Sequence, residues 1–182
     1  MVEEALIEIT EADGVQLRLA YRQADNFAGR RVYGPAARCL LRPEAAADLR
    51  RAVEIASRAG LTVRIFDTYR PQAAQEIFWS VLPDARYVAD PAVGSNHTRG
   101  VAMDLTLLDA NGVPLDMGSG FDDMRERSHH DCATLPAQVQ RNRLMLLGVM
   151  RHAGLASLAT EWWHYELPQA HRFALIPTDP RV

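Results

Sequence analysis

The stretch Ser95–Leu108, SNHTRGVAMDLTLL, combines the pattern of a strand with an acidic residue that strands normally exclude. Apolar residues recur at every second position from Val101 to Leu107, which is the period of a half-buried strand. Asp104 lies within this otherwise apolar run, and burying a carboxylate costs free energy unless it is paired or bound to a cation. We therefore expect a strand over residues 100–108 that holds a carboxylate beside a positive charge.

The flanking segments predict three helices and two further strands. The helices cover Pro43–Gly60, the segment from Pro71 to about Leu82, and Pro136–His152, and the strands cover Leu61–Phe66 and Leu158–Leu167. Proline at the first helical position and glycine beyond the last one mark helix ends, and Asn111-Gly112 predicts a tight turn. Because hairpin-type connections replace strict strand–helix alternation, we expect an α+β fold with a mostly antiparallel sheet and helices packed on it.

Length, charge and hydropathy narrow the class of protein. The 182 residues suit a single domain spanning residues 1–182. A net charge of −3 is too near neutral to indicate nucleic acid or an anionic membrane as a partner. No apolar stretch approaches the roughly 18 residues that cross a membrane, and Met1–Thr10 lacks the basic start of a secretory signal. We expect a cytoplasmic protein with an irregular tail over Pro177–Val182.

Cysteine and lysine usage bears on the available chemistry. Cys39 and Cys132 do not form a C-x-x-C pair, and two thiols do not make a disulfide framework, so both are expected to be free. All 20 basic residues are arginines. No lysine can therefore serve as a nucleophile, a Schiff base or a general base.

A second cluster, Glu161-Trp162-Trp163-His164, lies far downstream. A glutamate and a histidine three residues apart share a face on a helix but not on a regular strand. The bulky aromatic residues favour a strand, so we expect Glu161 on the loop that enters the strand and His164 within it. Glu161 would then lean over the group that His164 binds.

Three of these side chains form a ligand set typical of zinc. His97, Asp104 and His164 supply two imidazoles and a carboxylate, and they leave a fourth position open for water. An open position is typical of catalytic rather than structural zinc. Glu161 is then free to act as a general base toward that water.

Each motif alone has a structural alternative. Histidine is often a hydrogen-bonded core residue, and Asp104 has the alternative role of capping a turn. Trp162 and Trp163 are expected to be core or pocket wall. The separate motifs gain weight only from their combination and from the wider pattern of the chain.

That pattern resembles a known family. S-x-H-x-x-G-x-A-x-D at Ser95–Asp104 and E-x-W-H at Glu161–His164 are similar to the signature of the D-alanyl-D-alanine dipeptidases of the vancomycin-resistance type. These share a zinc peptidase group with the D,D-carboxypeptidases and the Hedgehog signalling domain. The resemblance also covers YRQADNFAG (21–29), DTYRP (67–71), DMGSGFDDMRERSHH (116–130) and EWWHY (161–165). It implies a Hedgehog/D,D-peptidase-like fold.

The resemblance implies roles for eight residues. His97, Asp104 and His164 match the ligands of one zinc ion per chain, and Glu161 matches the catalytic base. Arg70 matches an arginine that stabilises the tetrahedral intermediate, because a fixed guanidinium favours a developing oxyanion over a carbonyl. The other three, which match residues that hold the amino terminus of the substrate, are Tyr21, Ser95 and Asp122.

Other polar residues of the matched blocks receive no catalytic role. His129 and His130 are adjacent, as in a second metal site, but the resemblance implies no ligand role and we expect them to be structural. His152 and His171 are expected at the surface or at a helix end. The stretch between Arg70 and His97 is shorter than in the best-known members, so one wall of the pocket is expected to differ.

Together these expectations describe a zinc-dependent hydrolase of small D,D-dipeptides, with D-Ala-D-Ala as the expected substrate and partner. The alternatives are a D,D- or L,D-carboxypeptidase acting on cell-wall peptides and a non-catalytic zinc-binding module. Retention of Glu161 and Arg70 argues against the module, since a binding module needs no base beside its metal. Antibiotic resistance and the scavenging of cell-wall D-Ala-D-Ala as a nutrient are both compatible with such an enzyme.

Overall fold

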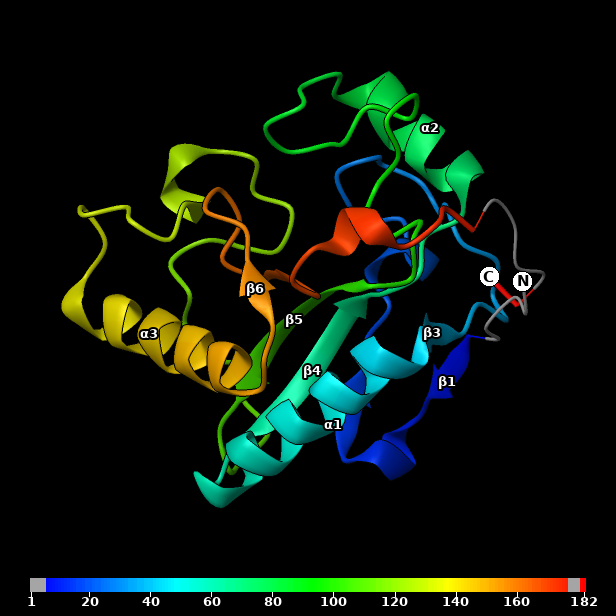
Figure 1. Ribbon diagram of the computed structural model, residues 1–182. Helices are drawn as coiled ribbons and strands as arrows, with labels where there is room; N and C mark the ends of the chain where they lie inside the picture. Colours follow the sequence, from blue (N-terminus) through cyan, green and yellow to red (C-terminus); the bar gives the residue numbers. More distant parts are fainter. Residues whose placement is uncertain (1–5, 177–180) are drawn as a thin grey trace.

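A five-stranded sheet forms the centre of the molecule (Figure 1). The structure is a computed structural model that describes residues 6–176 and 181–182. The strands of this sheet run in the order β2, β4, β5, β7, β6, and β1 and β3 form a separate two-stranded sheet. The strand bounds are β1 Ile7–Ile9, β2 Val15–Leu17, β3 Cys39–Leu41, β4 Thr62–Asp67, β5 Ala102–Leu108, β6 Ala156–Ser157 and β7 His164–Glu166. Among these strands only β2 and β4 pair in parallel, which confirms the mostly antiparallel α+β arrangement.

Strand β5 lies in the middle of the sheet and is buried along its whole length. Its neighbours β4 and β7 both run antiparallel to it. Asp104 pairs with His164 on one side and with Asp67 on the other. The register with β4 shifts between Ile65 and Asp67, where the apolar residues of β4 give way to an acid. The sheet itself therefore places three polar side chains next to one another.

Two helices cover one face of this sheet, as Figure 1 shows for α1 beside β4. The helices are α1 Pro43–Arg58, α2 Gln72–Val81 and α3 Ala137–His152, and 3-10 turns occur at Glu11–Asp13, Ala20–Arg22, Glu126–Ser128 and Ala170–Arg172. The apolar core joins α1 and α3 to the sheet and includes Ala45, Leu49, Ala52, Val63, Ile65, Leu105, Leu107, Leu146 and Val149. Because successive side chains of a strand point to opposite faces, Asp104 and Thr106 point away from this core.

The predicted helices, and the strands at β4 and β5, lie where the sequence placed them. Pro43 begins α1 as its first residue, and Pro71 immediately precedes α2. Gly112 adopts the left-handed conformation (φ 75°) that the expected turn at Asn111-Gly112 requires. Residues 177–180 of the expected irregular tail lie outside the described residues.

The strand predicted over Leu158–Leu167 is wrong in its first half. Only His164–Glu166 is extended, and the preceding residues form the turn of the β6–β7 hairpin. The Leu158 amide donates to the His164 carbonyl at 3.3 Å, which closes this turn. Trp162 and Trp163 are both buried within it, so their bulk indicated burial but not strand. Glu161 nevertheless lies on the loop before the strand and His164 within it, as expected.

Both cysteines are free in the described part of the chain, as expected. Cys39 is buried, Cys132 is half-buried, and both are free thiols. None of the helices in the described part of the chain has the length and apolar character needed to cross a bilayer.

The packing of α3 predicts very different effects for the same substitution at two nearby positions. Leu146 is 0% exposed in the core, whereas Leu144 is 65% exposed. Leu146→Ala should lower the free energy of unfolding by about 2–5 kcal/mol, because it leaves a cavity. Leu144→Ala carries the same change in helix propensity and should stay within about 0.5 kcal/mol. Urea unfolding followed by circular dichroism measures both, and equal losses would show that α3 is not packed as described.

Candidate active site

Two histidines and an aspartate converge above the middle of the sheet. Asp104 Oδ1 on β5 lies 3.1 Å from His164 Nδ1 on β7. His97, from the loop before β5, places its Nε2 3.3 Å from Asp104 Oδ2 and 3.2 Å from His164 Nδ1. All three side chains are buried, and one ligand atom from each lies within 4.8 Å of the other two.

The outer nitrogens of both imidazoles are occupied by acceptors. His97 Nδ1 donates to the Thr68 carbonyl at 2.7 Å, and His164 Nε2 donates to Glu166 Oε2 at 2.9 Å. Asn96 Nδ2 in turn donates to Glu166 Oε2 at 2.8 Å. Because these bonds place a hydrogen on the outer nitrogen of each ring, the inner nitrogens, His97 Nε2 and His164 Nδ1, can turn their lone pairs toward a metal at the convergence point.

The charges of this cluster favour a bound cation. Although burial opposes ionisation, His97 and His164 hold the pKa of the Asp104 carboxyl well below its usual range. Burial lowers the pKa of His164, but its hydrogen bonds to Asp104 and Glu166 raise it to about 10. Positive charge is therefore strongly stabilised here. Two imidazoles and one carboxylate are also the donor types that zinc takes in catalytic sites, so these residues fit a zinc ion.

Glu161 lies beside this cluster without belonging to it. Its Oε2 is 4.0 Å from His164 Nδ1, and its Oε1 is buried with no hydrogen-bond partner among the described residues. Burial raises the pKa of the Glu161 carboxyl to about 8. A carboxyl group with a free oxygen and a pKa near neutrality is suited to accept and return a proton.

Arg70 is held rigidly on the other side of Asp104. Its Nε and Nη2 donate to Asp67 Oδ2 at 3.0 and 2.9 Å, and its Nη1 donates to Gln75 Oε1 at 3.0 Å. The guanidinium lies 4.8 Å above the ring of Phe78. Nη2 is 3.6 Å from Asp104 Oδ2, so a fixed positive charge adjoins the convergence point.

A buried carboxylate with spare hydrogen-bonding capacity lies near these groups. Tyr21 donates its hydroxyl hydrogen to Asp122 Oδ1 at 3.0 Å. Asp122 Oδ2 is inaccessible to solvent and has no partner in the described part of the chain. Burial, with the charge of Asp104, raises the pKa of the Asp122 carboxyl well above its usual range. Asp122 also has the left-handed φ of 61°, which is uncommon for a non-glycine residue.

One cavity of about 230 Å³ joins all of these groups. Its lining includes the eight residues singled out in the sequence: Tyr21, Arg70, Ser95, His97, Asp104, Asp122, Glu161 and His164. The Ser95 hydroxyl accepts from the His97 amide at 3.2 Å, so Ser95 also orders the loop that carries His97. The structure thus brings together residues that are spread over most of the chain.

The chain is similar over most of its length to peptidases of known name. The peptidase family model described as D-ala-D-ala dipeptidase (Peptidase_M15) matches residues 6–179. The chain belongs to this family. It is 48% identical to a D-alanyl-D-alanine dipeptidase of Escherichia coli (strain K12), over 89% of this chain and 83% of that protein. Its identity is 37% to one of Streptomyces coelicolor, over 86% of this chain and 87% of that one. It is 34% identical to one of Enterococcus faecium, over 85% of this chain and 86% of that protein.

Sequence reasoning missed the residues that support the site. Asp67 and Gln75 fix Arg70, and Glu166 and Asn96 fix His164. Two of these left a signal in the sequence. Asp67 ends an apolar strand just as Asp104 interrupts one, and Glu166 lies two residues from His164, on the same face of a strand.

The remaining histidines lie apart from the cluster. His129 Nε2 is 3.1 Å from the Tyr87 hydroxyl, and His130 is half-buried. Neither joins the group of side chains in the described residues that can hold a metal. His152 ends α3 and His171 lies in a 3-10 turn, and both are exposed, as the sequence indicated.

The converging donors predict a metal content that depends on His97. Purified protein should contain about one zinc ion per chain, because a three-residue donor set with an open position holds a single ion. His97→Ala removes one donor from the buried set and should remove most of the zinc. His152→Ala changes an exposed histidine and should leave the metal content unchanged. Elemental analysis measures the zinc content of both variants. Full occupancy in His97→Ala would exclude this residue as a ligand.

Proposed function

We propose that the chain hydrolyses D-Ala-D-Ala to D-alanine within the cavity described above. The observation that carries this proposal is the convergence of a metal-binding triad, a base, a fixed guanidinium and an unpaired carboxylate on about 230 Å³. That volume suits a ligand smaller than most drug-sized molecules, such as a dipeptide of small residues. The two free cysteines suit a reducing compartment, so the cytoplasm is the location we propose.

Zinc is the metal we propose for His97, Asp104 and His164. When bound, it supplies a Lewis acid for the scissile carbonyl and lowers the pKa of water. The protein contributes the orientation of the donors. Thr68 and Glu166 hold the two imidazoles so that Nε2 of His97 and Nδ1 of His164 point inward.

Glu161 is the proposed general base. Its Oε1 is buried and has no partner among the described residues, so it is available to take the proton of the attacking water. The same carboxyl can then pass that proton to the leaving amine. Burial raises its pKa to about 8, and a cation in the neighbouring cluster acts in the opposite direction. These opposing effects keep the carboxyl able to both accept and release a proton.

Arg70 is proposed to stabilise the negative charge that develops on the carbonyl oxygen. The guanidinium is fixed by Asp67 and Gln75 before substrate arrives, so little reorganisation is needed during the reaction. Its position 3.6 Å from Asp104 Oδ2 places it on the same side of the cavity as the proposed metal.

Asp122 is proposed to bind the substrate ammonium, together with Tyr21 and Ser95. Asp122 Oδ2 has no partner among residues 6–176 and 181–182, and a buried carboxylate is stabilised by an opposite charge. Tyr21 holds the other oxygen and so orients the group. A dipeptide presents its ammonium one residue from the scissile bond, whereas a longer peptide presents a neutral amide at that point. This arrangement selects dipeptides.

Removing the proposed base should separate catalysis from metal binding. Glu161→Gln keeps the shape of the side chain but removes its basicity, so kcat should fall by a factor on the order of 10² or more. Zinc content should stay unchanged, because Glu161 is not one of the ligands. Glu126→Gln, at an exposed position, is the matched control. Loss of zinc from Glu161→Gln would instead identify Glu161 as a ligand.

Blocking the substrate ammonium should abolish most of the activity. N-acetyl-D-Ala-D-Ala leaves Asp122 buried without a counter-charge, so its kcat/KM should be at least ~10³-fold below that of D-Ala-D-Ala. Asp122→Asn removes the charge, and asparagine tolerates the left-handed φ of this position. The Asp122→Asn variant should bring the kcat/KM values of the two substrates closer together, chiefly by lowering kcat/KM for the free dipeptide. Comparable rates on both substrates in the unaltered protein would favour a carboxypeptidase.

A further inference from the structure

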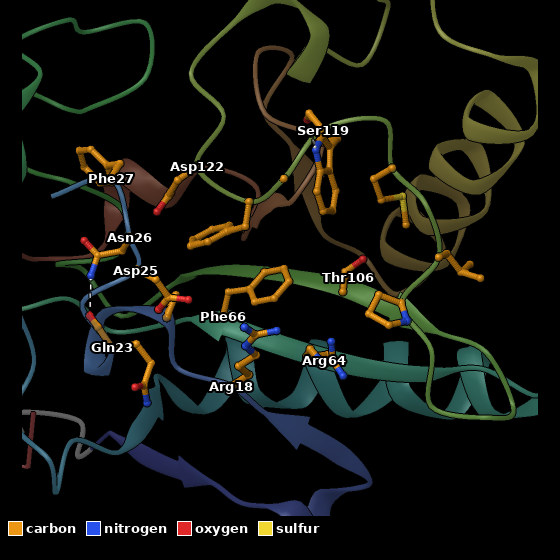
Figure 2. A pocket seen from close by; sticks show the side chains of 17 residues that line it. Arg18, Gln23, Asp25, Asn26, Phe27, Arg64, Phe66, Thr106, Ser119 and Asp122 are labelled. Carbon is orange, nitrogen blue, oxygen red and sulfur yellow. Dashed lines mark hydrogen bonds between the residues drawn. The ribbon is translucent and has the colours of Figure 1, made fainter. Parts of the chain in front are cut away.

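A second and larger cavity lies on the same face of the sheet as the proposed active site. Its volume is about 460 Å³, and it shares only Phe27 and Asp122 with the catalytic cavity. Figure 2 shows that its floor comes from the sheet, through Arg64, Phe66 and Thr106. The proposed hydrolysis makes no use of this space.

Two arginines without acidic partners line this cavity. Arg18 directly follows β2, and Arg64 lies on the adjacent strand β4. Arg64 Nε donates to Gln16 Oε1, and no ion pair forms at either guanidinium within the described residues. Burial and the charge of Arg18 lower the pKa of Arg64. The pair is therefore an uncompensated positive charge that an anion would stabilise.

The opposite charge within the cavity lies away from Arg64. Asp25 is exposed, and Figure 2 shows it on the side of Gln23 and Asn26, apart from Arg64 and Thr106. Asp122 also lines the cavity, but it accepts the Tyr21 hydroxyl hydrogen from the catalytic side. Neither carboxylate forms an ion pair with Arg64, so its Nη donors have no partner among the described residues and can bind a ligand.

The other walls are apolar and carry an unused hydroxyl. The rings of Phe66 and Phe121 stack at 4.7 Å, and Trp162 is fixed by donating to Ser119 Oγ at 2.9 Å. Thr106 is 2% exposed, and its Oγ1 has no hydrogen-bond partner in the described part of the chain. A buried hydroxyl without a partner indicates that a polar group is missing from this wall.

We propose that this cavity is a binding site for a small carboxylate with an apolar body, separate from the catalytic cavity. The planar guanidinium groups of Arg18 and Arg64 match the fork of a carboxylate, which binds two parallel N–H donors. The aromatic walls match the apolar body, while the exposed Arg18 and the half-buried Arg64 lie where the charged end would bind. The site requires neither the metal nor Glu161, so it is independent of the proposed function.

Phenylacetate is a suitable probe, and neutral phenylacetamide is its control of nearly equal shape. The titration uses the metal-loaded protein and follows the indole N–H signals by ¹H–¹⁵N NMR. Trp162 lines the proposed site and Trp163 lines the catalytic cavity, so the two signals report on different cavities. Phenylacetate should shift the Trp162 signal to saturation, and phenylacetamide should bind at least ~10-fold more weakly.

Variants identify the groups that bind the probe. The double substitution Arg18→Gln with Arg64→Gln should raise the Kd for phenylacetate by at least ~10-fold, because it removes the charge-assisted hydrogen bonds. Arg38→Gln, at an exposed arginine paired with Glu8, should leave binding unchanged. Hydrolysis of a dipeptide by the double variant, or its unchanged circular dichroism spectrum, shows that the fold is intact.

The results that overturn the proposal are equally definite. One is equal binding of phenylacetate and phenylacetamide, and another is undiminished binding to the folded double variant. A shift confined to Trp163, and lost in Arg70→Gln, would place the probe in the catalytic cavity. Absence of any saturable shift at millimolar concentrations would show that the cavity is not a carboxylate site. Failure of the proposed hydrolysis, in contrast, would leave the binding result unaffected.

Discussion

A carboxylate buried in the central strand is the constraint on which the rest of the site depends. Asp104 is 2% exposed at the middle of the sheet, where an isolated charge would be strongly destabilising. Three neighbouring side chains stabilise the carboxylate: those of His97, His164 and Arg70. Each of these groups is in turn fixed by an acceptor of its own. The order of the strands is what brings β7 and β4 to either side of this one residue.

Side chains of alternating charge continue outward from Asp104 and stabilise one another. Asp104 faces Arg70, Arg70 is bound by Asp67, and Asp67 accepts the Tyr33 hydroxyl hydrogen at 2.7 Å. Burial raises the pKa of Asp67, while Arg70 and His97 act to lower it. Such a buried network is rigid because removing any one member leaves another charge unpaired. This network holds the guanidinium of Arg70 in one position at the edge of the cavity.

The sequence predicted the regular elements and the chemistry better than the connections. The helices and the strands β4 and β5 have strong periodicity, and proline and glycine mark several of their ends. The three-residue strands β1, β2 and β3 have no detectable period, because their extension depends on pairing with distant segments. The turn over residues 158–163 was misassigned for a related reason. Its aromatic residues are buried by tertiary packing rather than by strand alternation.

The residues proposed to carry the chemistry were predictable from the sequence, whereas some of the groups that support them were not. The eight lining residues came from motif and resemblance, and all of them share one cavity. The supporting groups Gln75 and Asn96 could not be found this way, because polar residues on helices and loops are ordinary. The second cavity was equally hidden, since Arg64 on β4 and Arg18, just after β2, come together only when these two strands pair in the folded chain.

The hairpin that joins β6 to β7 has an evolutionary consequence. Glu161 lies in the turn that leads into β7, and His164 begins this strand and pairs across the sheet with Asp104, so the framework of the sheet constrains the positions of all three. Tyr21 and Asp122 come instead from a 3-10 turn and an irregular loop. Loops accept substitutions more readily than a central sheet does. Substitutions near positions 21–27 and 121–124 can therefore reshape the lining of the cavity while the sheet residues around Asp104 keep their places.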